Sequence, residues 1–165
     1  MIIQRLAPDE AQRAHALLAA SGQVLLRQGL DHWSPPAPLA SVQEQCTTKE
    51  VHVAVLHGQD AATWTIGTFG WHEDPGWTAA KTPCYLSRFT VRPDLQGQGL
   101  GRALAERIVA DWRARSADAI RLDVVAASAA ALAFWERLGC RRCGGWTWTN
   151  RHGKTYELIN LERIL

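Results

Sequence analysis

Hydrophobic residues recur along the chain at two spacings, about every second and about every fourth position, and this change predicts a mixed order of strands and helices. The first strand is expected in residues 1–7. A helix is then expected to open at Pro8 and run to about residue 30, with a break near Ser21 and Gly22. Residues 31–40 are proline-rich and predict a loop, which a short helix follows.

The middle of the chain predicts a hairpin and one further strand. Residues 51–56 and 63–72 are alternating or β-branched runs on either side of a turn that contains glycine. Residues 73–84 predict a loop, and the β-branched and aromatic residues 85–91 predict the next strand. The short helix before this region is expected over residues 41–48.

The second half of the chain predicts two helices and three strands. One helix is expected over residues 99–115, because apolar residues recur there at every fourth position. The other elements are a strand over 119–126, a helix over 128–138, and a closing hairpin of 144–149 and 155–165. We find no repeat or linker, so we expect one α/β domain spanning residues 1–165.

Composition and charge narrow the class of protein. The chain has 165 residues, of which 47% are hydrophobic and 21% charged, as in ordinary globular domains. The net charge is only +2 and the basic residues are scattered, which argues against nucleic acid as a partner. No long apolar run occurs, and the first ten residues do not resemble a signal peptide, so we expect a cytoplasmic protein without a membrane partner.

Four cysteines raise the question of a metal or a redox pair. They are Cys46, Cys84, Cys140 and Cys143, and the last two have the spacing of half a zinc site. No second pair of cysteines or histidines accompanies them. We therefore expect reduced structural thiols and no metal, with the last pair in a helix-to-strand turn.

Three glycines alternate within residues 96–101, between the strand expected at 85–91 and the helix that follows. The first N–H groups of a helix have no intrahelical partner, and glycines let a phosphate approach them. A tight turn alone is the other explanation. The segment lacks the lysine of GxxxxGK[ST] and the spacing of GxGxxG, which disfavours a dinucleotide oxidoreductase.

The glycine segment resembles the acyl-CoA pyrophosphate loop of the GNAT superfamily of N-acetyltransferases. Gln96, Gly99 and Gly101 match the family pattern [QR]xxGx[GA]. Residues 86–112 are similar to the family's fourth strand, loop and third helix, and residues 120–140 to its fifth strand and fourth helix. The resemblance implies a mixed, strongly twisted sheet of about six to seven strands, flanked by helices and splayed between the fourth and fifth strands.

The same resemblance implies acetyl-CoA as co-substrate. The backbone of Phe89, Thr90 and Val91 would bind the pantetheine arm, and Ser128 and Trp135 would lie beside the cofactor. The N–H groups expected to bind the pyrophosphate belong to Gln96, Gly97, Gln98, Gly99, Leu100, Gly101 and Arg102.

The chain departs from the family at its catalytic positions. Trp135 and Ala129 stand where many members have a tyrosine acid and an asparagine, and an indole does not donate a proton usefully near neutral pH. Tyr85 and Ser128 are the candidates that the sequence offers for proton transfer. Asp123 is interpreted as a structural partner of Arg88.

The acceptor pocket is expected in the N-terminal half, lined by His32, Trp33, Trp71 and Glu73. Aromatic faces beside carboxylates suit a cationic amine. We therefore expect an enzyme that transfers an acetyl group from acetyl-CoA to a primary amine: a small amine, an amino acid or a peptide N-terminus. A non-catalytic acyl-CoA-binding or regulatory protein of the same fold is the alternative, and the sequence leaves a homodimer open.

Overall fold

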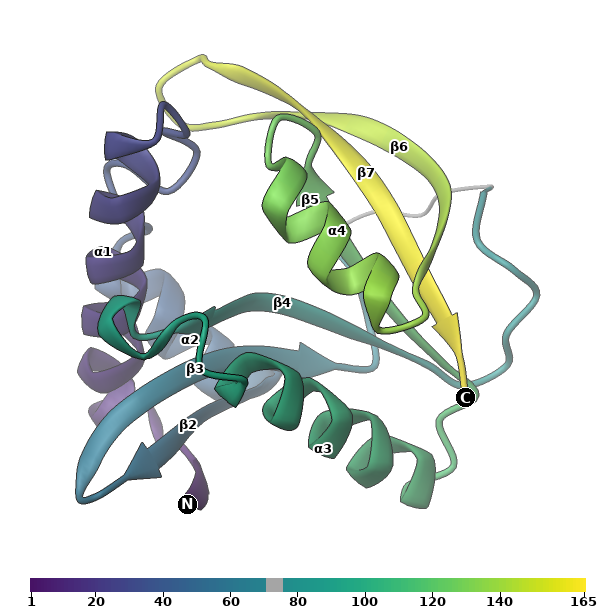
Figure 1. The fold of residues 1–165 in the computed structure, drawn as a ribbon, viewed down its shortest axis with the longest axis horizontal. Helices are drawn as coiled ribbons and strands as arrows, with labels where there is room; N and C mark the ends of the chain where they lie inside the picture. The colour runs from purple at the N-terminus through teal and green to yellow at the C-terminus, as the bar shows by residue number, and fades with distance from the viewer. Residues whose placement is uncertain (71–75) are drawn as a thin grey trace. The chain divides into compact units, whose positions relative to one another are not determined.

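The computed structural model describes residues 1–70 and 76–165, and Figure 1 shows its ribbon. The chain divides into two compact units. Unit 1 comprises Met1–Gly67 and Leu86–Leu104, and unit 2 comprises Thr68–Tyr85 and Ala105–Leu165. Strand β4 (Pro83–Val91) contributes its first three residues to unit 2 and the remainder to unit 1.

The strands form a seven-stranded mixed sheet in the order β1-β2-β3-β4-β5-β7-β6. Strand β4 pairs in parallel with β5 (Ala119–Val125) through Pro83–Tyr85. This ladder ends where Tyr85 lies opposite Arg121, although β4 continues to Val91 within unit 1. The mixed sheet, and the end of pairing between its fourth and fifth strands, confirm the fold class predicted from the sequence.

Unit 1 consists of strands β1 to β4 with helices on the sheet. Its elements are β1 (Ile2–Arg5), the 3-10 turn η1 (Pro8–Glu10), α1 (Ala11–Arg27), α2 (Leu39–Thr48), β2 (Glu50–Leu56), β3 (Gln59–Gly67), the end of β4, η2 (Pro93–Leu95) and the start of α3 (Leu100–Ala114). Strands β1 and β3 each pair antiparallel with β2.

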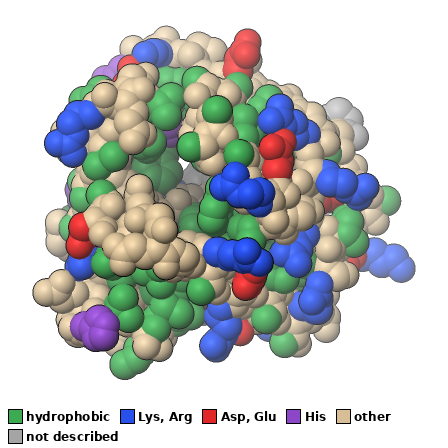
Figure 2. Space-filling model, viewed as in Figure 1, with side chains coloured by type: hydrophobic (Ala, Val, Ile, Leu, Met, Phe, Trp, Pro, Cys, Tyr) green, Lys and Arg blue, Asp and Glu red, His purple; other side chains and the backbone are tan. Residues whose placement is uncertain are grey.

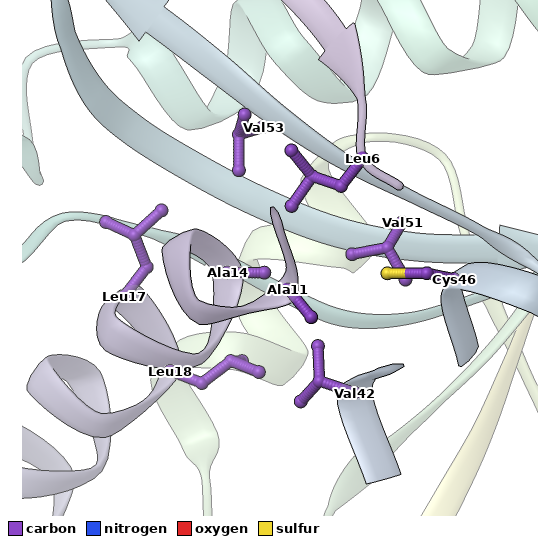
Figure 3. Close-up of a cluster of buried hydrophobic side chains, with 9 residues drawn as sticks. All are labelled: Leu6, Ala11, Ala14, Leu17, Leu18, Val42, Cys46, Val51 and Val53. Carbon is purple, nitrogen blue, oxygen red and sulfur yellow. The ribbon is translucent and has the colours of Figure 1, made fainter. Parts of the chain in front are cut away.

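The core of unit 1 follows the spacing of its apolar residues. Figure 3 shows nine buried side chains that gather between α1, α2 and strand β2: Leu6, Ala11, Ala14, Leu17, Leu18, Val42, Cys46, Val51 and Val53. They recur every three or four residues on the helices and every second residue on β2. Burying a leucine or valine side chain completely stabilises the fold by about 1.5–3 kcal/mol, so this cluster fixes the helices against the sheet.

The break expected in the first helix does not occur, because α1 is continuous through Ser21 and Gly22. A Cβ atom added to Gly22 would lie only 2.5 Å from the carbonyl oxygen of Trp33. The glycine therefore allows a close approach of the chain after α1 and does not end the helix.

The hairpin between β2 and β3 is tighter than the sequence suggested. Its turn consists of His57 and Gly58, whose φ angles of 50° and 76° both lie in the left-handed region. A two-residue turn of this kind matches the twist of the flanking strands. Strand β3 therefore begins at Gln59, earlier than the predicted residue 63.

Unit 2 contains β5, β7 (Thr155–Ile164) and β6 (Arg141–Thr149), together with α4 (Ala129–Arg137) and most of α3. Strand β5 pairs antiparallel with β7 along its whole length, from Ala119 opposite Ile164 to Val125 opposite Leu158. A small core cluster of Val125, Tyr156 and Leu158 lies in this unit, with Trp146 and Trp148 packed against it.

Strand β6 begins at Arg141, so Cys143 lies inside a strand and not in the turn that we expected. All four cysteines are free thiols. Burial raises the pKa of Cys84 to about 12 and that of Cys140 to about 11, which keeps both thiols protonated and unreactive. Within residues 1–70 and 76–165, no group of three or more histidine, cysteine or acidic side chains could hold a metal ion.

The surface carries charges of both signs. In Figure 2, Lys and Arg side chains of the described residues stand at several separate places on one face, with Asp and Glu side chains among them. This distribution agrees with the scattered basic residues of the sequence. Of the helices described, none has the length and apolar character that crossing a membrane requires.

Candidate functional site

The last residues of β4, Phe89, Thr90 and Val91, form one side of the candidate site. Thr90 and Val91 are each only 7% exposed. The Thr90 hydroxyl lies 2.6 Å from the hydroxyl of Ser21 on α1, and both side chains are buried in unit 1. Because the side chains of Thr90 and Val91 pack inward, an extended ligand along this strand would be bound by its backbone.

The segment after β4 is fixed by side-chain amides. Gln96 donates from Nε2 to the Val91 carbonyl oxygen at 2.9 Å. Gln98 donates from Nε2 to the Asp94 carbonyl oxygen, also at 2.9 Å. These bonds hold the turn between η2 and α3 against the end of β4, so the backbone of this segment is shaped before any ligand binds.

Arg92 anchors the same segment to the hairpin of β2 and β3. Its guanidinium contacts both carboxylate oxygens of Asp94, at 2.7 and 3.1 Å, and donates to Gln59 Oε1 at 3.0 Å. The hydrogen bond from Arg92 lowers the pKa of the exposed Asp94 carboxyl. The pair positions the turn that precedes α3.

The three glycines of the loop differ in backbone conformation. Gly97 and Gly99 have φ angles of 76° and 83°, which L side chains rarely adopt, and a Cβ at either position would have no atom within 4 Å. Gly101 lies in the first turn of α3 without a left-handed φ. The turn thus requires the first two glycines, and open space surrounds them.

Helix α3 presents its N-terminus at this open turn. The N–H group of Ala103 donates to the Gly99 carbonyl oxygen at 3.1 Å, the first bond of the helical ladder. The N–H groups of Leu100, Gly101 and Arg102 precede that bond and lack intrahelical acceptors. Together with the positive end of the helix dipole, they form an arrangement that binds anions such as a pyrophosphate.

The structure therefore brings together in unit 1 the residues predicted to bind pantetheine and pyrophosphate. They are Phe89, Thr90, Val91, Gln96, Gly97, Gln98, Gly99, Leu100, Gly101 and Arg102.

Ser128 and Trp135, also predicted to bind the cofactor, belong to unit 2. Ser128 is the residue before α4 and is buried, but its hydroxyl makes no capping hydrogen bond to the helix. Trp135 is 8% exposed and packs edge-on against Phe134, with ring centroids 4.9 Å apart. Their place beside the cofactor stays a prediction.

Tyr85, a candidate for proton transfer, lies in a buried hydrogen-bond network of unit 2. Its hydroxyl oxygen accepts a hydrogen bond from Arg121 Nη1 at 2.8 Å. Arg121 also contacts Glu162 Oε1 at 2.8 Å and the Thr78 carbonyl oxygen at 2.7 Å. Burial lowers the pKa of Arg121, but its hydrogen bonds to Glu162 and Tyr85 outweigh that effect, and the pKa is raised. A structural role accounts for these contacts, and the catalytic role of Tyr85 stays a prediction.

Two of the four predicted acceptor-pocket residues are described. His32 is half-buried and meets Trp33 edge-on at 5.9 Å, and burial lowers its pKa against the opposing effect of Asp31. Trp33 packs against the core cluster of unit 1. Trp71 and Glu73, with His72 and Asp74 beside them, lie outside the described residues.

Sequence reasoning missed the environment of Arg88. We expected a pair with Asp123, whereas Arg88 Nη2 donates to the hydroxyl of Ser41 on α2 at 3.1 Å. The backbone of Arg88 is left-handed, with a φ of 52° inside strand β4. An arginine among strand-forming residues gives no sequence signal for either feature, because both depend on tertiary packing.

Known proteins share this architecture. A ribosomal-protein-alanine N-acetyltransferase of Brucella melitensis superimposes with a TM-score of 0.71 over 100% of both chains, at 21% identity. The ribosomal-protein-S18-alanine N-acetyltransferase of Escherichia coli gives a TM-score of 0.72 over 99% of this chain and 92% of its own, at 20% identity. These structures establish the shared fold.

Sequence comparison gives the family. A [ribosomal protein bS18]-alanine N-acetyltransferase of Escherichia coli strain K12 is 44% identical over 54 residues. The match covers 33% of this chain and 36% of that protein, so it spans about a third of the curated relative. Residues 23–140 match the acetyltransferase (GNAT) family model, a range that includes the glycine loop, β5 and α4. The chain therefore belongs to the GNAT family of acetyltransferases.

Proposed function

We propose that this protein transfers an acetyl group from acetyl-CoA to a primary amine, carried by a small amine, an amino acid or a peptide N-terminus. The observation that carries the proposal is the turn before α3. Two left-handed glycines there, with open space where a side chain would stand, lead directly into the N-terminus of a fifteen-residue helix. A pyrophosphate is the part of acetyl-CoA that such a site would bind.

The rest of unit 1 agrees with an extended acyl-CoA. With the pyrophosphate at residues 96–102, the pantetheine arm would run back along the backbone of Phe89–Val91. The buried contact between Ser21 and Thr90 holds that strand end against α1. The thioester would then lie toward the Arg88 end of this segment.

Transfer forms a bond between the amine nitrogen and the acetyl carbon as the carbon–sulfur bond breaks, and the amine loses a proton. An amine with a pKa of about 10.4 costs roughly 4 kcal/mol to neutralise near pH 7.4, whereas a leaving thiol with a pKa of about 8.5 needs little help. Removing the acceptor's proton is therefore the larger demand. Tyr85 and Ser128 stay the sequence-based candidates for proton transfer.

Trp135 in place of the family tyrosine does not argue against catalysis. A general acid contributes about 10²- to 10⁴-fold, so its loss slows transfer without abolishing it. The name of the Escherichia coli relative, an alanine N-acetyltransferase for ribosomal protein bS18, also supports an amine as the acceptor.

Acetyl-CoA binding followed by an acceptor panel tests the proposal. Acetyl-CoA at a hundredfold excess over its Kd should stabilise the folded protein by about 2.7 kcal/mol, seen as a thermal shift. Release of the CoA thiol is then measured with amines, amino acids and peptides. Absence of a thermal shift at millimolar acetyl-CoA contradicts the proposal. A shift without turnover on any acceptor favours the non-catalytic acyl-CoA-binding alternative.

A further inference from the structure

Arg88 has an unusual backbone for a residue within a strand. Its φ of 52° is left-handed, although it stands between Ser87 and Phe89 in β4. Such a conformation is costly for an L residue with a large side chain, and it persists only where surrounding structure holds it. It takes the Arg88 side chain out of the regular alternation of the strand and toward α2, where Ser41 accepts its hydrogen bond.

The Arg88 guanidinium is incompletely partnered. Nη2 donates to the Ser41 hydroxyl at 3.1 Å, while Nη1 is buried and has no hydrogen-bond partner among the described residues. Burial lowers the pKa of Arg88, and no charged side chain within residues 1–70 and 76–165 offsets that effect. Arg88 is half-buried, and a guanidinium nitrogen that is shielded from water and unpaired is stabilised when an anion completes it.

Two further polar groups in this part of unit 1 are buried without a hydrogen-bond partner. Gln45 lies one helical turn after Ser41 on α2, on the same face. Its Oε1 accepts from Thr65 at 3.4 Å, which leaves its Nε2 donor unpaired, and the Ser87 hydroxyl is also unpaired. Arg88 Nη1 and Gln45 Nε2 are thus two buried N–H donors without a hydrogen-bond partner among the described residues, and Ser41, to which Arg88 donates, lies one helical turn before Gln45. N–H donors of this kind suit a carboxylate.

The position of Arg88 relates this set to the acceptor, a step that rests on the proposed function. If pyrophosphate binds at residues 96–102 and pantetheine along Phe89–Val91, the thioester lies at the end of that segment where Arg88 stands. A ligand group bound by Arg88 is then carried by the molecule that meets the thioester, which is the acceptor.

We propose that Arg88, with Gln45 one helical turn after its partner Ser41, binds a carboxylate of the acceptor. The acceptor class is then an amino acid, or a similar small molecule with a carboxylate near its amine. The planar guanidinium can offer a carboxylate two parallel N–H donors. Such a contact strengthens the binding of the acceptor and also orients its amine.

Matched acceptor pairs test this directly. Initial rates of CoA release are measured for the common amino acids and for their primary amides, which lack the carboxylate. Because the amides also have a less basic amine, each rate is divided by the fraction of amine that is neutral at the assay pH before the two are compared. The expected kcat/KM is at least about tenfold higher for the acids, since a charge-assisted hydrogen bond is lost in the amides. Equal rates for acids and amides, or a preference for an amidated peptide, would overturn the inference without any variant.

Two arginine variants sharpen the test. Arg88→Met should lower kcat/KM about 10- to 100-fold on the acids and less than about threefold on the amides. Arg107→Met is the control, because Arg107 is exposed on α3 and pairs only with Asp111 at 2.8 Å. Loss of activity on acids and amides alike in Arg88→Met would show a structural role and contradict the proposal.

A binding measurement separates this inference from the proposed function. Amino acids should raise the melting temperature of the native protein in the presence of CoA, and should not raise that of Arg88→Met. If no amine is acetylated but this difference is seen, the transfer activity is wrong and the carboxylate site stands. If transfer occurs but the amides bind and react as well as the acids, the activity stands and the carboxylate site is wrong.

Discussion

Two arginines, the half-buried Arg88 in unit 1 and the buried Arg121 in unit 2, have contrasting surroundings. Arg121 meets a carboxylate, a phenol and a carbonyl oxygen, all within 2.8 Å, and these bonds keep its pKa raised. Arg88 meets one hydroxyl, and burial lowers its pKa. Removing a partner of Arg121 would leave a buried charge uncompensated, whereas Arg88, which no described carboxylate neutralises, is suited to an anionic ligand.

The largest expected change in stability comes from breaking the hydrogen-bond network around Arg121. Glu162→Leu leaves the Arg121 charge buried beside an apolar side chain and should lower the free energy of unfolding by about 3–5 kcal/mol. Urea denaturation measures the change. Glu136→Leu removes an exposed pair with Arg142 and should cost no more than about 1 kcal/mol. Equal losses in the two variants would mean that Arg121 and Glu162 contribute no more than a surface pair.

The glycine loop gives a second contrast, between a turn that serves a ligand and one that serves only the chain. Gly99→Glu and Gly58→Glu each place a side chain at a left-handed φ with open space around it. Both should lose about 1–2 kcal/mol of stability. Only Gly99→Glu should lose the thermal shift with acetyl-CoA, because its carboxylate repels the pyrophosphate at the N-terminus of α3.

Retained acetyl-CoA binding in a folded Gly99→Glu variant would show that the glycine serves the turn alone. Loss of binding in Gly58→Glu as well would attribute the effect to general instability. Comparing the two variants therefore separates an effect on acetyl-CoA binding from the effect of the left-handed backbone that both glycines share.

Replacing Arg88, which has few hydrogen-bond partners, should change the free energy of unfolding by less than Glu162→Leu does, and in the opposite direction. Arg88→Met keeps a long side chain and the same backbone strain but removes a half-buried charge that no described side chain neutralises. The free energy of unfolding should therefore rise by about 1 kcal/mol in the absence of ligand. Thermal unfolding of the two proteins without CoA measures the difference. A loss of stability comparable to that of Glu162→Leu would mean that Arg88, too, is structural.

The smallest expected effect concerns His32, a second basic group of unit 1 whose charged form burial disfavours. Its folded-state pKa lies below the ordinary 6.5, so the unfolded chain takes up a proton first as the pH falls. Stability is therefore lost as the pH falls below about 6.5, and His32→Gln should reduce that loss. Unfolding curves from pH 7.5 to 5.5 measure it, with His152→Gln in the exposed β6–β7 turn as control. An unchanged slope in His32→Gln contradicts the prediction.

Features that are local in sequence could be predicted, and those set by distant contacts could not. The glycine loop follows from a short motif placed between a strand and a helix, and the structure has both elements there. A break was predicted at Gly22 because the reason for this glycine lies at Trp33, far along the chain. The predicted start of β3 was too late because the left-handed backbone of His57 and Gly58 closes the turn in two residues. Ser41 and Arg88 are 47 residues apart, so no local pattern relates them.

The side-chain amide of Gln96 ties the turn to the preceding strand, which the glycines of the turn cannot do. By donating to the Val91 carbonyl oxygen at 2.9 Å, it joins the last residue of β4 to the loop that leads into α3. In an enzyme of the proposed activity, this bond would hold the phosphate site next to the last residue of the strand that binds the pantetheine arm. The enzyme would then select donors by the length of their pantetheine arm, because a donor with a shortened arm could not occupy the phosphate site and the thioester site at once.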